Sequence, residues 1–225
     1  MLTEFAPSLY VADGPVVSFY GFPYPTRMVV VRLSSGGLWV WSPVAPTPAL
    51  AAAIDALGPV QEIVSPNKIH HLFLAAWAAR WPAARLHAPP GLPARRLDLR
   101  FASELGDEPD PRWVGEIDQT VFRGSPVLEE VAFLHRASRT AIVGDLVQRH
   151  EPIGGWRGLA MRLDGLVGEG GSTPREWRLT FLRRGPARAA RARLLGWRPE
   201  RLVVAHGACA RHDATGILAR ATAWI

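Results

Sequence analysis

Histidine or aspartate follows a short apolar run at three places in this sequence. These are His70 and His71 after residues 60–64, Asp145 after residues 140–143, and His206 after residues 202–205. Imidazole and carboxylate groups are good ligands for zinc, iron or manganese. An incomplete set of protein ligands also leaves room for a water molecule that the metal activates. The residue types therefore predict a metal site with hydrolytic chemistry.

Each of these residues also has an ordinary structural explanation. Adjacent histidines can cap a helix or bond to backbone groups, and they point in different directions, so we expect only one of the two to bind metal directly. Asp145 follows a glycine and so suits a turn, and His206 can simply end a strand. Their coincidence at three strand ends favours a shared site. Cys209 lies near His206 and is expected to line the site, although no base that would activate its thiol is evident.

Residues on different strands meet only if a sheet brings the strand ends together. Short runs rich in β-branched and aromatic residues, bounded by turn residues, predict strands at 9–11, 16–20, 28–33, 38–41, 60–64, 85–87, 117–122, 130–134, 140–143 and 202–205. Helices are expected at 46–57, 71–80, 156–163, 174–182, 187–195 and 213–224. Thr47 and Pro48 suit the start of the first helix, and Gly58 suits its end.

The order of these elements predicts the fold class. Strands followed by alternating helices and strands occur twice, which favours an α/β protein built as an αββα sandwich of two mixed sheets flanked by helices. No linker and no sequence repeat is visible, so we expect residues 1–225 to form a single domain. Glu129 and Glu130 open a strand in the second half, where we expect a solvated pair of carboxylates.

Composition narrows the class of protein. Hydrophobic residues make up 48% of the 225 residues and charged residues 20%, which is typical of a folded globular protein. No run approaches the roughly 18 apolar residues of a membrane helix, and the N-terminus lacks the pattern of a signal peptide. Cys209 is the only cysteine, which excludes an internal disulfide and a cysteine-based zinc cluster. We therefore expect a cytoplasmic protein without a membrane partner.

The formal net charge of +6 comes almost entirely from arginine, and many arginines fall within residues 183–201. A basic helix face can bind a phosphate backbone. This segment lacks interleaved exposed aromatic residues and any nucleic-acid-binding motif, so a solvated helix face is favoured over a nucleic-acid partner.

The segments around these residues resemble the metallo-β-lactamase superfamily of metallohydrolases, and within it a divergent, uncharacterised branch. The resemblance covers nearly the whole chain. In that family the first loop has the pattern His-x-His-x-Asp-His. With the last histidine placed at His71, Pro66 and Lys68 occupy the positions of the first two histidines, and His70 occupies that of the aspartate.

The resemblance implies that one of the family's two metal sites is lost and the other reduced. A further family histidine, usually in a Gly-His-Thr turn, is missing near residues 124–126, so the three-histidine site has lost all three of its histidines. Asp145 matches the carboxylate that bridges two metals, and His206 matches the final histidine. The expected ligands of one divalent ion (zinc, iron or manganese) are His71, Asp145 and His206, with His70 in place of a carboxylate.

The resemblance also implies a role for Lys68, the only lysine in the chain. Its ammonium group would occupy the vacated metal site and supply positive charge to Asp145, because a buried ammonium group needs a carboxylate partner. Asn67, in the same loop, is expected to line the site beside it.

Three functional classes follow from these observations. The first is a mononuclear metal-dependent hydrolase in which a metal-bound water attacks an ester, amide, thioester or phosphoester of unknown identity. The second is a catalytically degenerate relative that binds a ligand or partner in the same cleft. The third, which the sequence favours least, is a nucleic-acid-associated protein that uses its arginine-rich helices. The sequence assigns no catalytic acid or base and no oligomeric state.

Overall fold

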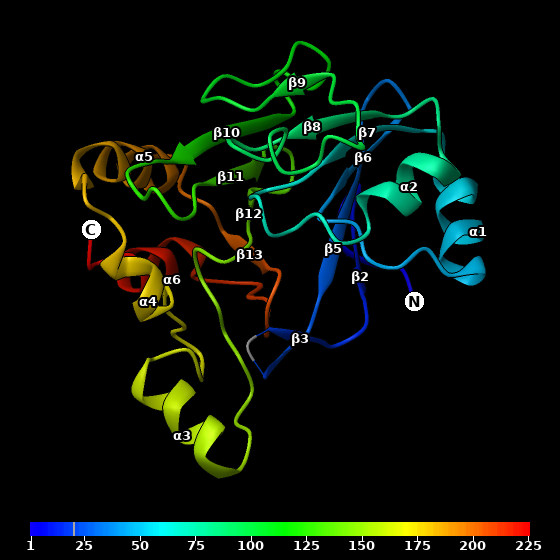
Figure 1. Cartoon of the computed structure of the whole chain (residues 1–225). Coiled ribbons are helices and arrows are strands. Elements are labelled where there is room, and N and C mark those ends of the chain that lie inside the picture. The colour runs from blue at the N-terminus through cyan, green and yellow to red at the C-terminus, as the bar shows by residue number, and fades with distance from the viewer. Residues whose placement is uncertain (20) are drawn as a thin grey trace.

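The computed structural model describes residues 1–19 and 21–225, and its main strands form two mixed sheets that pack face to face (Figure 1). The first sheet comes from the first half of the chain. In spatial order its strands are β1 (Thr3–Ala6), β2 (Leu9–Asp13), β5 (Arg27–Arg32), β6 (Leu38–Trp41), β7 (Val60–Val64), β8 (Arg85–Ala88) and β9 (Ser103–Glu104). Strands β1 to β6 pair antiparallel, and β6 to β9 pair parallel.

The second sheet comes from the second half of the chain. Its strands, in order, are β10 (Ile117–Phe122), β11 (Glu130–His135), β12 (Thr140–Val143) and β13 (Arg201–Val204). Only β12 and β13 are parallel, with Val143 opposite Val204, so their carboxyl ends lie side by side. A separate two-stranded ribbon consists of β3 (Val17–Phe19) and β4 (Phe22–Tyr24).

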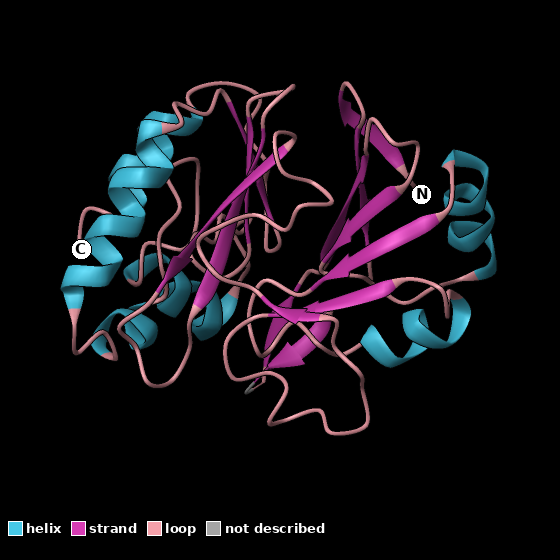
Figure 2. Ribbon diagram, turned by 90° about the horizontal axis from the view of Figure 1, so that it is seen from above, coloured by secondary structure: helices cyan, strands magenta, loops and turns pink. Residues whose placement is uncertain are grey.

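Helices cover the outer sides of both sheets (Figure 2). The helices α1 (Pro48–Leu57) and α2 (Leu74–Arg80) pack on the first sheet, and α5 (Arg184–Gly196) and α6 (Ala214–Ala221) pack on the second. The long connection from β12 to β13 also carries α3 (Gly155–Leu163) and α4 (Arg175–Leu179). This arrangement is the αββα sandwich that the sequence predicts.

Large aromatic side chains fill the space between the two sheets. Trp39, Trp113 and Phe133 are fully buried there and meet edge to face, with ring centroids 6.4 Å apart for the two tryptophans and 5.2 Å for Trp39 and Phe133. Fully burying a side chain of this size stabilises a fold by about 2–3 kcal/mol. The inner faces of both sheets are therefore held rigidly, and with them the loops at the strand ends.

The first helix begins and ends as the sequence predicts. The side chain of Thr47 accepts a hydrogen bond from Leu50 N at 3.3 Å, Pro48 is the first helical residue, and Gly58 follows the last turn. At Gly58 φ is 151°, and a Cβ there would lie 2.7 Å from Gly36 O, so only glycine fits.

Several predicted elements differ from the structure, among them the closing helix expected at 213–224, which spans only Ala214–Ala221. The helix expected at 71–80 begins only at Leu74, because residues 70–73 form a succession of turns. The strand expected at 16–20 belongs to the separate ribbon rather than to the first sheet, and its last residue, Tyr20, lies outside the described residues. The helix expected at 174–182 is shorter, because α4 spans only Arg175–Leu179.

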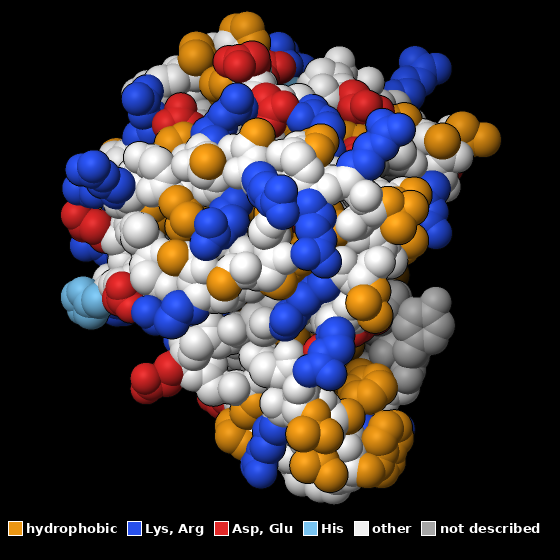
Figure 3. Space-filling model, turned by 90° about the vertical axis from the view of Figure 1, so that its left-hand side faces the viewer, with side chains coloured by type: hydrophobic (Ala, Val, Ile, Leu, Met, Phe, Trp, Pro, Cys, Tyr) orange, Lys and Arg blue, Asp and Glu red, His pale blue; other side chains and the backbone are white. Residues whose placement is uncertain are grey.

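Helix α3 projects from the sandwich, and apolar side chains gather on its surface (Figures 1 and 3). Trp156, Leu159 and Leu163 are 68%, 59% and 68% exposed, and their spacing places them on one helix face. Within residues 1–19 and 21–225, no helix is both long and apolar enough to cross a membrane.

Several arginines of α5 bind the C-terminal segment of the chain. Arg184 and Arg188 donate to the main-chain oxygens of Trp224 and Ile225, and Arg191 donates to Thr222 Oγ1 and Ala219 O. Part of the basic cluster in residues 183–201 thus has a structural role, since these guanidinium groups satisfy carbonyl oxygens at the end of the chain.

Candidate metal centre

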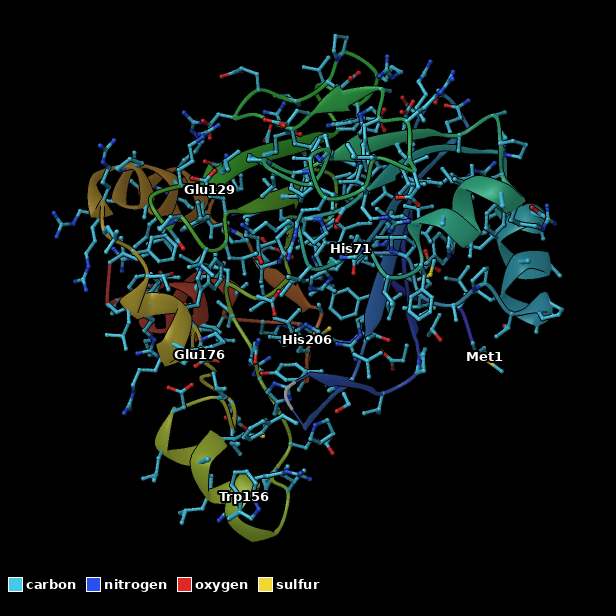
Figure 4. The ribbon with its side chains drawn as sticks, in the orientation of Figure 1. Met1, His71, Glu129, Trp156, Glu176 and His206 are labelled. Carbon is cyan, nitrogen blue, oxygen red and sulfur yellow. The ribbon has the colours of Figure 1, made fainter. Side chains whose placement is uncertain are left out.

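Three loops from two sheets bring the predicted donor residues together. His70 lies in the loop after β7 of the first sheet, Asp145 follows β12 and His206 follows β13. Asp145 and His206 are neighbours because β12 and β13 are parallel. The packing of the sheets then brings His70 to the same place, and Figure 4 shows His206 in the middle of the molecule between the two halves.

The donor atoms converge closely enough to share one ion. His70 Nε2 lies 3.2 Å from Asp145 Oδ2, and His206 Nε2 lies 3.3 Å from Asp145 Oδ1. One ligand atom from each of the three residues lies within 4.8 Å of the others. Ligands held at about 2.1 Å from a tetrahedral ion are about 3.4 Å apart, so this spacing suits joint ligation as well as direct hydrogen bonding.

Hydrogen bonds at the far side of each ring fix the orientation of the two histidines. His206 Nδ1 lies 2.7 Å from Pro25 O, and since a carbonyl only accepts, Nδ1 carries the proton. In the charged ring Nε2 also carries a proton and donates it to Asp145, and in the neutral ring Nε2 has the free lone pair that a metal ligand requires. His70 Nδ1 lies 2.7 Å from Ser42 Oγ, so its Nε2 atom is held on the same carboxylate.

The charges in this group stabilise one another. Burial raises the pKa of Asp145, but hydrogen bonds and charge from His206 and His70 outweigh it and hold that pKa well below its usual range. Burial lowers the pKa of His206, yet the Asp145 carboxylate has the larger combined effect and raises it. The group is therefore built to keep a carboxylate ionised in a buried position.

A second buried carboxylate lies beneath Asp145 and was not expected from the sequence. Glu130 is fully buried, so the expected solvated pair at residues 129 and 130 is wrong for Glu130. Its oxygens accept hydrogen bonds from the backbone N–H groups of Gly144, Asp145 and Leu146 at 2.8, 2.7 and 3.2 Å. Burial and the charge of Asp145 raise the pKa of Glu130 to about 7, and the hydrogen bonds act in the opposite direction.

Asn67 links the two carboxylates. Its Nδ2 atom donates to Glu130 Oε2 and to Asp145 Oδ2, both at 2.9 Å, and its Oδ1 accepts from the backbone N–H groups of Ile69 and His70. One side chain thus fixes the position of Asp145 and the course of the loop that carries His70. Asn67 was predicted to line the site, and it lies fully buried behind the three donor residues.

Glycine is required immediately after His206. At Gly207 φ is 106°, and a Cβ there would lie 2.0 Å from Arg149 O. The backbone approaches this closely because Arg149 N donates to His206 O and Ala208 N donates to Arg149 O. The turn that orients His206 therefore depends on a residue without a side chain.

A cavity of about 730 Å³ opens on the donor group. This volume is in the range of small-molecule sites. His70, Asp145 and His206 all border it, together with Tyr24 and Gln148. The remaining lining residues are Val17, Thr26, Ser42, Pro43, Lys68, Ile69, Leu72, Phe73, Arg95, Val127, Leu128, Pro174, Glu176, Trp177 and Thr180.

Comparison with known proteins places the chain in a family. The model of a family described as a domain of unknown function, DUF4336, matches residues 17–152, which is more than half of the chain. The chain belongs to the DUF4336 family. The matched segment contains His70 and Asp145, and His206 lies beyond it. None of the curated proteins matches the sequence.

Solved structures establish the fold of this DUF4336 protein. It is similar to the DIM-1 metallo-β-lactamase exposed to ceftazidime, with 14% identity over 97% of this chain and 94% of that one and a TM-score of 0.66. A metallo-β-lactamase from Pontibacter korlensis has 13% identity over 100% and 97%, also with a TM-score of 0.66. The Flv1 flavodiiron core from Synechocystis has 11% identity over 100% of this chain and 60% of that one, with a TM-score of 0.68. The protein thus has the metallo-β-lactamase fold in a divergent form, which confirms the resemblance seen in the sequence.

The structure corrects which of the adjacent histidines faces the site. Of the two, only His70 joins the donor group; His71 instead lies beside Arg96, whose Nη1 is 3.1 Å from His71 Nδ1 and 2.9 Å from its carbonyl oxygen. Burial, then the charges of Arg96 and Arg95, lower the pKa of His71. The pattern His-x-His-x-Asp-His therefore aligns one residue earlier than predicted. Its successive positions fall at Ser65, Asn67, Ile69 and His70.

Lys68 borders the cavity, as predicted, but its predicted pairing with Asp145 is wrong. No ion pair joins Lys68 to Asp145 among the described residues, because both oxygens of Asp145 already face other donors. Cys209 lies near the site but faces Arg27, whose Nη1 is 3.1 Å from its Sγ. Burial raises the pKa of the Cys209 thiol, so it has little nucleophilic character.

Two polar residues that the sequence analysis missed extend the site. Gln148 Nε2 donates to Asp145 Oδ1 at 3.0 Å, and His150 Nε2 donates to Gln148 Oε1 at 3.0 Å. The rings of His150 and His206 are nearly parallel, with centroids 6.4 Å apart. The alternation of Gln148 and His150 after Asp145 was the available signal, since alternate residues of an extended segment point to the same side.

His150 makes the protein sensitive to acid. Burial and the charge of His206 lower the pKa of His150 to about 4, whereas an unfolded histidine has a pKa of about 6.5. Between about pH 6.5 and pH 4, His150 binds a proton in the unfolded chain but not in the folded protein. The free energy of unfolding therefore falls as the pH falls through this range, by about 3 kcal/mol for this histidine. We expect His150→Gln to lose less stability than the wild type between pH 7 and pH 4.5 in urea unfolding. The exposed His212→Gln should follow the wild type, and coincident profiles for all three proteins would contradict the assignment.

Proposed function

We propose that this DUF4336 protein is a hydrolase of a small-molecule substrate and uses one divalent metal ion held by His70, Asp145 and His206. One observation carries the proposal: two oriented imidazole Nε2 atoms face the two oxygens of a single buried carboxylate at the wall of a cavity of about 730 Å³. When bound, such an ion polarises the oxygen of an ester, amide or phosphoester and lowers the pKa of a water molecule. Three protein ligands leave a position open for that purpose.

The surrounding residues position the donor set. Pro25 O and Ser42 Oγ hold the two imidazole rings, and the amide groups of Asn67 and Gln148 hold the Asp145 carboxylate. Their hydrogen bonds restrict the rotamers of the ligands before any ion arrives, which reduces the entropy lost on binding. Histidine with carboxylate suits zinc, iron or manganese rather than calcium or magnesium.

A second candidate function follows from the same contacts. Asp145 faces four donors of the protein itself, namely Asn67, His70, Gln148 and His206, so the carboxylate has a complete set of partners without an ion. That arrangement favours a catalytically degenerate relative that uses the cavity only to bind a ligand.

Metal analysis separates the two candidates. If the protein binds the ion, purified protein loaded with zinc, iron(II) or manganese should contain about one ion per chain. Its unfolding temperature should also rise by about 10 °C at saturating metal, because a ligand at 1,000 times its Kd stabilises the folded protein by about 4 kcal/mol. We expect His70→Ala to lower the metal content at least tenfold and the adjacent His71→Ala to leave it unchanged. A wild-type protein that neither retains any of these ions nor gains stability from them would leave only ligand binding.

A further inference from the structure

Two cations border the cavity without an acidic partner. Lys68 is half-buried and Arg95 is exposed, and within the described part of the chain neither side chain forms a hydrogen bond or an ion pair. The neighbouring Arg96 differs, because Asp98 neutralises it at 2.6 Å. Positive groups that line a cavity and are not neutralised by a carboxylate attract anions, so this pair points to an anion from outside the protein.

Lys68 does not pair with the donor group. No oxygen of Asp145 lies within ion-pairing distance of Lys68, and the Lys68 side chain instead reaches the turn at Gly91, where a Cβ would lie 3.9 Å from its Cδ. The other carboxylate on the cavity, Glu176, is on α4. Among the described residues, Glu176 forms no ion pair with Lys68 or Arg95. Neither carboxylate that lines the cavity therefore neutralises these two cations.

The rest of the cavity wall is largely apolar. Leu72 and Val127 border it and are 63% and 56% exposed, so their apolar surface is open to a ligand in the cavity. Further apolar side chains on the wall are Val17, Ile69, Phe73, Leu128, Pro174 and Trp177. An apolar wall with a few polar groups that fix the orientation of the ligand is typical of a small-molecule site.

We propose that Lys68, supported by Arg95, binds the anionic group of an amphiphilic substrate whose apolar body lies against Leu72 and Val127. The substrate class is an apolar molecule that carries a carboxylate, sulfonate or phosphate group. This inference rests on the proposed function in one respect, because it places the bond to be hydrolysed at His70, Asp145 and His206. The binding of the anion by Lys68 does not depend on the proposed function.

Two fluorescent probes of the same shape test the anion site. The anionic probe is 8-anilinonaphthalene-1-sulfonate and the neutral one is N-phenyl-1-naphthylamine, each titrated into metal-free protein. We expect Lys68→Met to weaken binding of the anionic probe about tenfold, as for a lost hydrogen bond to a charged group, and to change binding of the neutral probe less than twofold. Leu72→Asn should weaken both probes. Arg32→Met, which removes an exposed cation outside the cavity lining, should weaken neither.

Displacement of the probes then identifies the preferred anion. Octanoate and octyl phosphate should displace the anionic probe from wild-type protein at lower concentration than octanol, and this preference should vanish in Lys68→Met. An equal effect of Lys68→Met on both probes, or none on either, would overturn the proposal. Because no metal is present, a failure here is distinct from a failure of the metal analysis.

Discussion

Replacement of Glu130 by glutamine should lower the free energy of unfolding by about 3 kcal/mol or more. Each oxygen of Glu130 accepts two hydrogen bonds, from Gly144 N and Leu146 N on one side and from Asp145 N and Asn67 Nδ2 on the other. A glutamine presents one oxygen and one NH₂ group, so one pair of buried donors would face another donor. Urea unfolding at pH 7 measures the loss.

The adjacent residue provides a matched control for this experiment. Glu129 is only half-buried and accepts one long hydrogen bond, from Gly124 N at 3.3 Å, so Glu129→Gln should change the free energy of unfolding by about 0.5 kcal/mol at most. Equal stabilities for the two variants would show that Glu130 is already protonated and accommodates an amide, contrary to the role assigned to it here.

Replacement of Asp145 by asparagine should abolish metal binding. The variant keeps the size of the side chain but removes the only anionic oxygens between His70 and His206, so we expect the metal affinity to fall by more than about 100-fold. The pKa of His206 should fall as well, because its burial lowers that pKa and the Asp145 contacts raise it more than Pro25 O and Glu130 do. Isothermal titration with zinc measures the first effect, and NMR titration of the His206 ring measures the second.

A carboxylate elsewhere in the chain serves as the control for this variant. Asp213 pairs with Arg220 at the surface and does not line the cavity, so Asp213→Asn removes the same charge and should leave both the metal affinity and the pKa of His206 unchanged. Retention of wild-type metal affinity by Asp145→Asn would exclude the proposed ligand set.

Local sequence patterns were sufficient to predict the fold, and the expected ligand set included all three donor residues together with His71, which does not join them. Asp145 and His206 each follow an apolar run, and β12 and β13 end there as expected. The choice between His70 and His71 was wrong because the helix begins at Leu74, so the turns before it, rather than helical spacing, decide which ring faces the cavity. A motif aligned on the sequence alone contained no information about those turns.

The residues behind the metal centre could not be predicted from local patterns. Glu130 stands beside another glutamate, which suggests a solvated strand end, and its burial arises only when backbone N–H groups from the turn after β12 surround it. Whether Lys68 pairs with Asp145 likewise depends on the distance between two loops, which packing sets. Tertiary contacts of this kind, rather than propensity, decide whether a charged residue is exposed.

The division of the donor residues between two sheets has a consequence for how the protein would acquire an ion. The first sheet and His70 come from the first half of the chain, and the second sheet, Asp145 and His206 come from the second half. Even the ring of His206 is oriented by Pro25 from the opposite half. Neither half alone presents a complete ligand set, so an ion could be captured only after both had formed and docked. Metal uptake would then be among the last steps of maturation and would join the two halves after folding rather than guide it.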